Sequence, residues 1–149
     1  MLAKEAWLAP ELLKTCPAEV LFATGIDAFT QLLESYTTPK NNHITDALAW
    51  QGMNLFKGAF ENINSVDENK QQQGYSNLML AASMFGTTLA NAGLVAVHGL
   101  ASSIGVFFDA PHGIVCAKLL APITSANIEV LLKTEPESLT LNKYKQIGK

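Results

Sequence analysis

Apolar residues recur at three- and four-residue steps through most of this chain, which is the spacing of one face of an α-helix. Pro17 can open a helix as its first residue. The apolar stripe of the following segment, Thr24–Tyr36, predicts an amphipathic helix, and the polar run 37–42 ends it. The same spacing predicts a second helix from residue 43 or 44 to Phe60.

The second half of the chain predicts three further helices. The polar stretch 61–73 should contain an exposed loop and then the start of a long helix, which ends at Asn91-Ala92-Gly93. A fourth, buried helix is expected from Leu94 to Phe107. A fifth is expected from Pro111 to Thr124, with a kink or an end near Pro122.

The tail after Val130 turns polar and basic, so we expect it to be frayed or weakly helical. The sequence shows no alternation of strand and helix patterns and no internal repeat. A length of 149 residues suits one compact domain. The prediction is therefore an all-α helical bundle that spans residues 1–149 as a single unit.

Charge and motifs exclude several function classes. The net charge is -3, only 10 residues are Lys or Arg, and no arginine occurs, which argues against a nucleic-acid partner. Neither G-x-G-x-x-G nor G-x-x-x-x-G-K is present, so the chain has no recognisable nucleotide site of its own. Two distant cysteines and the lack of a sustained apolar run predict a cytoplasmic protein with no membrane partner.

Two of the three histidines, His98 and His112, lie in a segment of almost only small and apolar residues. A buried imidazole needs a partner, which can be a carbonyl, a carboxylate, water or a metal. The turn Asp109-Ala110-Pro111 can fold the second ring back toward the first. Two interpretations remain open at this point: satisfied core histidines, or a pair of metal ligands. His43, at a loop-to-helix boundary, is expected to be a surface or capping residue.

Three polar residues of the first helix, Asp27, Gln31 and Glu34, are spaced so that they share one helix face. The pattern is typical of the solvated side of an amphipathic helix. However, Asp is a poor residue for a helix interior unless its carboxylate is needed there. The pattern alone leaves both interpretations open.

Four blocks of sequence together resemble the iron-containing (group III) alcohol dehydrogenase family. They are GIDAFTQLLESY at 25–36, ITDALA at 44–49, NAGLVAVHGLA at 91–101 and PHG at 111–113. They occur in the family's order and spacing, and the similarity extends from about Pro10 to Asn127. The resemblance implies the C-terminal helical domain of the dehydroquinate synthase-like / iron-containing alcohol dehydrogenase fold. It implies a partial domain, without the N-terminal nucleotide-binding domain that such enzymes use to bind NAD(P).

The resemblance also implies a site for a divalent metal, iron or zinc. Asp27, His98 and His112 match the family's metal ligands, and Gln31 stands where the family usually has a fourth ligand, a histidine. A glutamine carbonyl is a weaker and harder donor than imidazole. Ser102 is a second departure, since many members have a histidine there. In the family's reaction, the metal stabilises an alkoxide while hydride passes to the nicotinamide.

Two hypotheses about function follow. The first is that the chain supplies the metal site of an NAD(P)-linked alcohol dehydrogenase for a small alcohol or aldehyde, and is inactive alone. The second, favoured by Gln31 and Ser102, is a non-catalytic helical structural or interaction module from a truncated or degenerate dehydrogenase. In either case, an apolar face without its usual cover predicts self-association into a homo-oligomer.

Overall fold

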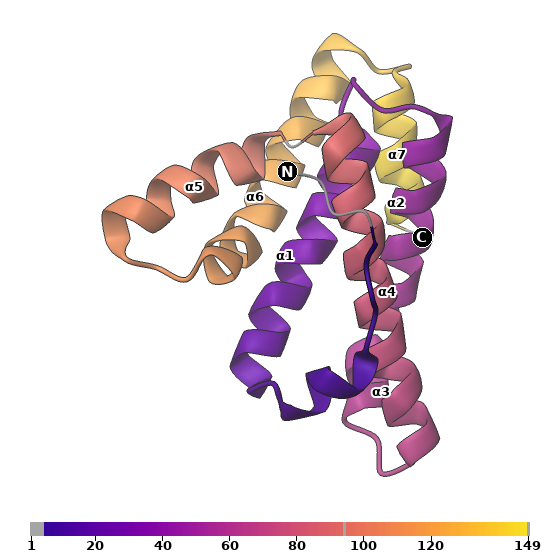
Figure 1. Cartoon of the computed structure of the whole chain (residues 1–149). Helices are drawn as coiled ribbons and strands as arrows, with labels where there is room; N and C mark the ends of the chain where they lie inside the picture. Colours follow the sequence, from indigo (N-terminus) through magenta and orange to yellow (C-terminus); the bar gives the residue numbers. More distant parts are fainter. Residues whose placement is uncertain (1–4, 94, 149) are drawn as a thin grey trace.

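The computed structural model describes residues 5–93 and 95–148, and every regular element in this part of the chain is helical. The elements are η1 (Pro10–Thr15), α1 (Ala18–Thr37), α2 (His43–Phe56), α3 (Ala59–Ile63), α4 (Glu68–Ala92), α5 (Ala96–Phe108), α6 (His112–Thr134) and α7 (Leu139–Ile147). This confirms the all-α prediction. Helices α1, α2, α4 and α7 form a bundle, α5 projects to one side of it, and α6 returns from α5 to pack against α1 and α7 (Figure 1).

Helix α1 is the central element because it packs against α2, α4 and α6. Its apolar stripe supplies Leu32, Leu33 and Tyr36 to the main core, as its spacing predicts. Partners from three other helices complete that core: Ala49, Met53, Ala81 and Tyr144. Pro17 is the N-cap of α1 rather than its first helical residue.

The second predicted helix is divided in two. It ends at Phe56 rather than Phe60, because Gly58 takes a left-handed conformation (φ 70°) and the short helix α3 begins directly after it. The start of α2 is well specified, since Asn42 and Thr45 cap it reciprocally. His43 is the exposed first residue of α2, which confirms its expected place at a surface boundary. The third predicted helix is α4, and it ends as expected before Gly93.

Helices α5 and α6 depart from the sequence expectations in two ways. The fourth helix is not buried throughout, because Val106, Phe107 and Phe108 at its end are 83%, 82% and 76% exposed. The fifth helix does not end near Pro122 but continues through it to Thr134. The predicted start of the fourth helix at Leu94 lies outside the described residues.

The C-terminal segment is a packed helix, so the expectation of a frayed tail is wrong. Helix α7 begins at a Ser138 cap and buries Leu141, Lys143 and Tyr144. The Lys143 ammonium donates to the Asp46 carboxylate at 2.7 Å. This contact spans 97 residues of sequence, which is why local patterning missed it.

Helix α6 also differs from the expectation that no segment could span a membrane. By length and composition alone it is long and apolar enough to do so. Core helices of water-soluble proteins meet the same criterion, and α6 packs against α1, α5 and α7. However, only 11% of its apolar stretch is buried, so this chain leaves the outer side of α6 largely uncovered.

Candidate metal centre

The predicted site residues come from three helices that meet beside the middle of α1. Asp27 and Gln31 lie on α1, His98 on the first turn of α5, and His112 is the first residue of α6. The Nε2 atoms of His98 and His112 are 3.1 and 3.6 Å from the same oxygen, Oδ1 of Asp27. The two imidazole rings have centroids 5.4 Å apart, so the Asp109-Ala110-Pro111 turn does fold one toward the other.

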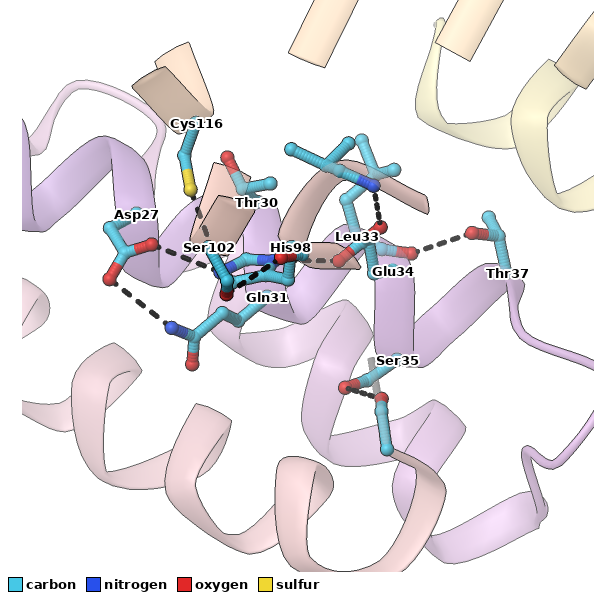
Figure 2. A network of polar contacts seen from close by, with 12 residues as sticks. Asp27, Thr30, Gln31, Leu33, Glu34, Ser35, Thr37, His98, Ser102 and Cys116 are labelled. Carbon is cyan, nitrogen blue, oxygen red and sulfur yellow. Dashed lines mark hydrogen bonds and ion pairs between the residues drawn. The ribbon is translucent and has the colours of Figure 1, made fainter. Parts of the chain in front are cut away.

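The His98 ring is held on both of its nitrogens (Figure 2). Its Nδ1 is 2.7 Å from Oε2 of Glu34, while its Nε2 faces Asp27. The other Glu34 oxygen accepts the backbone N–H of Val97 at 2.7 Å, which fixes the start of α5 against α1. Glu34 is buried, so the solvated interpretation of this face of α1 is wrong at Glu34 and also at the buried Gln31.

Burial and the charges of this cluster shift the pKa values of His98, Asp27 and Cys116. Burial lowers the pKa of His98, but its hydrogen bonds to Asp27 and Glu34 and their negative charges raise it by more, to about 9. Burial raises the pKa of Asp27, but the hydrogen bonds from His98 and Cys116 and the nearby histidines outweigh this and lower it overall. Burial and the neighbouring Asp27 raise the pKa of the Cys116 thiol to about 12.

Cys116 is a member of the cluster that the sequence analysis did not name. It lies one turn after His112 on α6 and is fully buried. Its Sγ is 3.5 Å from Nε2 of His112 and 3.7 Å from Nε2 of His98. One donor atom from each of Asp27, His98, His112 and Cys116 lies within 4.8 Å of all the others. These four side chains could hold a metal ion between them.

Gln31, which stands where the family usually has a histidine ligand, is brought to the same place. Its Nε2 donates to Oδ2 of Asp27 at 3.2 Å (Figure 2). Its Oε1 is buried and has no hydrogen-bond partner among the described residues. In this orientation Gln31 positions the Asp27 carboxylate and presents no acceptor to the cluster.

Ser102 does not join the cluster. Its hydroxyl donates to the backbone carbonyl of His98, one turn earlier on α5, at 2.9 Å. This is a local helix contact.

Close backbone packing sets the distance between α6 and α1. Gly113 follows His112, and a Cβ at that position would meet the backbone carbonyl of Ala23, with the carbonyl carbon at 2.7 Å. Glycine therefore allows the start of α6, with His112 and Cys116, to approach Asp27.

One side of the cluster is open. The His112 side chain is 44% exposed, whereas that of His98 is 6% exposed. A groove of about 410 Å³ runs past His112 and Asp27 between the starts of α1 and α6. A small molecule in this groove could reach the open side of the cluster.

Comparison with known proteins identifies the origin of this arrangement. Residues 21–149 match the C-terminal region of the Fe-containing alcohol dehydrogenase family. The chain belongs to that family. This confirms the resemblance found in four sequence blocks, and it assigns residues 21–149 to the C-terminal region of that family.

Individual relatives of the family support this assignment. The chain is 32% identical to alcohol dehydrogenase 4 of Saccharomyces cerevisiae over 120 residues, which cover 80% of this chain and 31% of the yeast protein. It is 33% identical to 1,3-propanediol dehydrogenase of Klebsiella pneumoniae over 119 residues, covering 80% of this chain and 30% of that protein. Lactaldehyde reductase of Escherichia coli is 28% identical over 144 residues, covering 97% of this chain and 34% of the enzyme.

A solved structure shows the same fold. Alcohol dehydrogenase from Oenococcus oeni superposes with a TM-score of 0.73 at 27% sequence identity. The match covers 93% of this chain and 38% of that chain. The chain thus spans about a third of the length of the curated relatives it matches.

Two residues of the cluster, Glu34 and Cys116, escaped the functional prediction for different reasons. Glu34 has the helical spacing of a solvated residue, and its partner His98 is 64 residues away. Cys116 carried a usable signal, because a cysteine four residues after a histidine shares its helix face.

Proposed function

We propose that this chain supplies the metal-binding part of a metal-dependent, NAD(P)-linked alcohol dehydrogenase. Asp27, His98 and His112 would bind one divalent ion, iron or zinc. The complete enzyme would act on a small alcohol or aldehyde. Membership of the Fe-containing alcohol dehydrogenase family supports this assignment.

The observation that carries the proposal is the convergence of the two histidine Nε2 atoms on one carboxylate oxygen, Oδ1 of Asp27. The Glu34 carboxylate beside Nδ1 of His98 adds to it. A carboxylate on one ring nitrogen orients the imidazole and leaves the other nitrogen to bind a metal, which is the usual arrangement around metal-ligating histidines. Neither feature is expected of two unrelated core histidines.

The residues of this chain would then have distinct roles. A bound divalent ion would act as a Lewis acid on the alcohol oxygen. Asp27 would offset its charge, Glu34 would hold the His98 ring, and the exposed edge of His112 would border the substrate. The groove beside His112 and Asp27 has room for a small alcohol.

The nucleotide would have to come from elsewhere. The sequence holds no glycine-rich phosphate loop, and the chain spans about a third of its relatives' length. We therefore expect the isolated chain to show no NAD(P)-linked turnover of simple alcohols. Measurable turnover by the purified chain alone would contradict this expectation.

Solubility and assembly follow from the same proposal. We expect a cytoplasmic protein that forms homo-oligomers through its uncovered apolar surfaces. Val106, Phe107 and Phe108, at the end of α5, form the most exposed apolar run among the described residues. Sedimentation over a wide concentration range tests this, and a constant monomer would contradict it.

Metal content tests the central proposal. The chain is incubated anaerobically with iron(II) or zinc(II), freed of excess ion, and analysed for bound metal. We expect close to one ion per chain in the unmodified protein, and a loss of that ion in His98→Ala and in His112→Ala. The exposed His112 is the safer variant, because its removal leaves the buried Glu34–His98 contact in place.

His43→Ala is the matched control. It removes the third histidine, which is exposed on α2 and is not part of the cluster. We expect it to retain the ion. Absence of metal from the folded, unmodified chain would instead favour the non-catalytic helical module.

A further inference from the structure

The side chain at position 31 leaves the cluster without a fourth ligand from α1. Its amide N–H points to Asp27, and its buried carbonyl oxygen has no partner in the described part of the chain. With the amide in this orientation, a fourth protein ligand of the site would have to come from another element.

Cys116 on α6 is in the position to be that donor. It is fully buried, and its sulfur lies close to both histidine Nε2 atoms. His112 and Cys116 are four residues apart in the first turns of α6, so one helix presents both side chains to the same point. The other cysteine, Cys16, lies between η1 and α1 and is not in the cluster.

Four of the six distances among the donor atoms match the edges of a small tetrahedron, and all six lie within 4.8 Å. Zinc bonds to oxygen, nitrogen and sulfur are about 2.0–2.3 Å long, so neighbouring ligands of a tetrahedral site are about 3.3–3.7 Å apart. The sulfur is 3.5 and 3.7 Å from the two histidine nitrogens. Those nitrogens are 3.1 and 3.6 Å from Oδ1 of Asp27. These four distances are thus within a few tenths of an ångström of this range.

We propose that Cys116 is a fourth protein ligand of the metal site, and that the Asp27–His98–His112–Cys116 set selects zinc over iron. The inference rests on the metal site proposed above and specifies its chemistry. A divalent ion converts a coordinating thiol to the thiolate. Zinc(II) binds nitrogen, oxygen and sulfur ligands more tightly than iron(II) does, and a soft thiolate ligand should strengthen that preference at this site.

Cobalt(II) provides a direct test, because thiolate coordination gives an intense charge-transfer absorption in the near ultraviolet. The apo-protein is titrated with cobalt(II), in parallel with Cys116→Ser and with Cys16→Ser as the matched control. We expect the absorption in the unmodified chain and in Cys16→Ser, and its absence in Cys116→Ser. Circular dichroism establishes that each variant is folded.

Zinc affinity gives a second measurement. Loss of a residue that only orients a ligand costs 10–100-fold in affinity. Loss of a ligand itself should weaken zinc binding by at least about 100-fold in Cys116→Ser. The ratio of iron(II) to zinc dissociation constants should fall in the same variant, since an oxygen donor replaces the sulfur.

The outcomes separate this inference from the proposed function. Cobalt bound without the thiolate absorption, and with equal zinc affinity in Cys116→Ser, would overturn the role of Cys116 and leave the Asp27–His98–His112 site standing. Failure of the folded, unmodified chain to bind zinc or cobalt would overturn both.

Discussion

Two buried polar clusters contact α1, and they differ in how their charges are matched. In one, the Lys143 ammonium of α7 donates to Asp46 at 2.7 Å and to the backbone carbonyl of Tyr36 at 2.8 Å. One positive group faces one carboxylate. In the other, two carboxylates, Asp27 and Glu34, face one buried imidazole, His98, and the partly exposed His112 also lies beside Asp27.

The difference separates a structural contact from a binding site. A buried ion pair whose charges and hydrogen bonds are satisfied fixes the position of two elements and needs nothing more. A cluster with two carboxylates around one buried imidazole and several metal-binding atoms is stabilised by an added cation. The Lys143 cluster therefore serves to dock α7, and the His98 cluster is suited to a metal.

Lys143→Met should have the largest effect on stability. It leaves the Asp46 carboxylate and the Tyr36 carbonyl without the ammonium that satisfies them. Removing one partner of a buried pair costs about 4 kcal/mol. Urea unfolding should report this loss, and the loss should be the same with and without bound metal.

The double variant Lys143→Met/Asp46→Leu supplies the control. It removes both charges, so it should recover a substantial part of the stability that the single variant loses. A double variant no more stable than Lys143→Met would show that the charge pair is not the reason for the loss.

The His98 cluster should make the metal-free protein sensitive to alkaline pH. The pKa of His98 is raised to about 9 in the folded chain, from an ordinary value of 6.5. The folded state therefore holds this proton more tightly than the unfolded chain. The resulting stability is complete below pH 6.5 and is lost as the pH rises through 9. The loss is on the order of 3 kcal/mol at most.

Urea unfolding in the presence of a chelator, at several pH values, measures this effect. Glu34→Gln should move the decline to lower pH, because one of the two carboxylates that stabilise the imidazolium is removed. His43→Ala should leave the decline unchanged. A metal-free protein equally stable at pH 6 and pH 9 would contradict the charge imbalance of the cluster.

Gly113→Ala should damage the metal centre without changing a ligand. The added methyl group would meet the backbone of Ala23, so α6 must move away from α1 and carry His112 and Cys116 from Asp27. Overpacking of this kind costs about 2 kcal/mol. We expect a lower zinc affinity, measured by competition with a chromophoric chelator.

Gly74→Ala is the matched variant at a close helix contact outside the metal centre. Its Cβ would meet the carbonyl oxygen of Ala59 at 2.7 Å, where α4 packs on α3. It should cost similar stability but leave zinc affinity unchanged, because α3 and α4 contribute no residue to the cluster. Equal losses of zinc affinity in the two glycine variants would point to general loosening of the fold.

The sequence could predict elements that rest on local patterns, but not those that depend on contacts between distant residues. The helical spacing located α1, α2 and α4, because each buries a local apolar stripe. It could not locate α7 as a packed helix, since the burial of Lys143 depends on Asp46, 97 residues away. It predicted a kink or an end near Pro122, because an internal proline removes a backbone hydrogen bond and crowds the preceding turn; the helix does not end there, since α6 continues to Thr134.

Some residues of the candidate site could be named from the sequence, and others are recognised only in the folded structure. Asp27, His98 and His112 could be named from sequence because a family resemblance covered them, and the structure brings them together. Glu34 could not be assigned a role, because its spacing on α1 is that of a solvated residue and only the fold places it against Nδ1 of His98. The place of Cys116 beside His112 could have been predicted from the four-residue spacing alone.

Ser102→Ala should have the smallest effect, although Ser102 marks a departure from the family's sequence pattern. Its hydroxyl donates to the carbonyl of His98 within α5, and that carbonyl lies in a helix that can bond it through the backbone. The side chain is exposed, so its removal should change stability by less than about 0.5 kcal/mol. Zinc affinity should be unchanged, because the hydroxyl contacts the backbone and not the His98 ring. A clear fall in zinc affinity in this variant would contradict this expectation. It would mean that the backbone of α5, and not only the contact with Glu34, sets the position of the His98 ring.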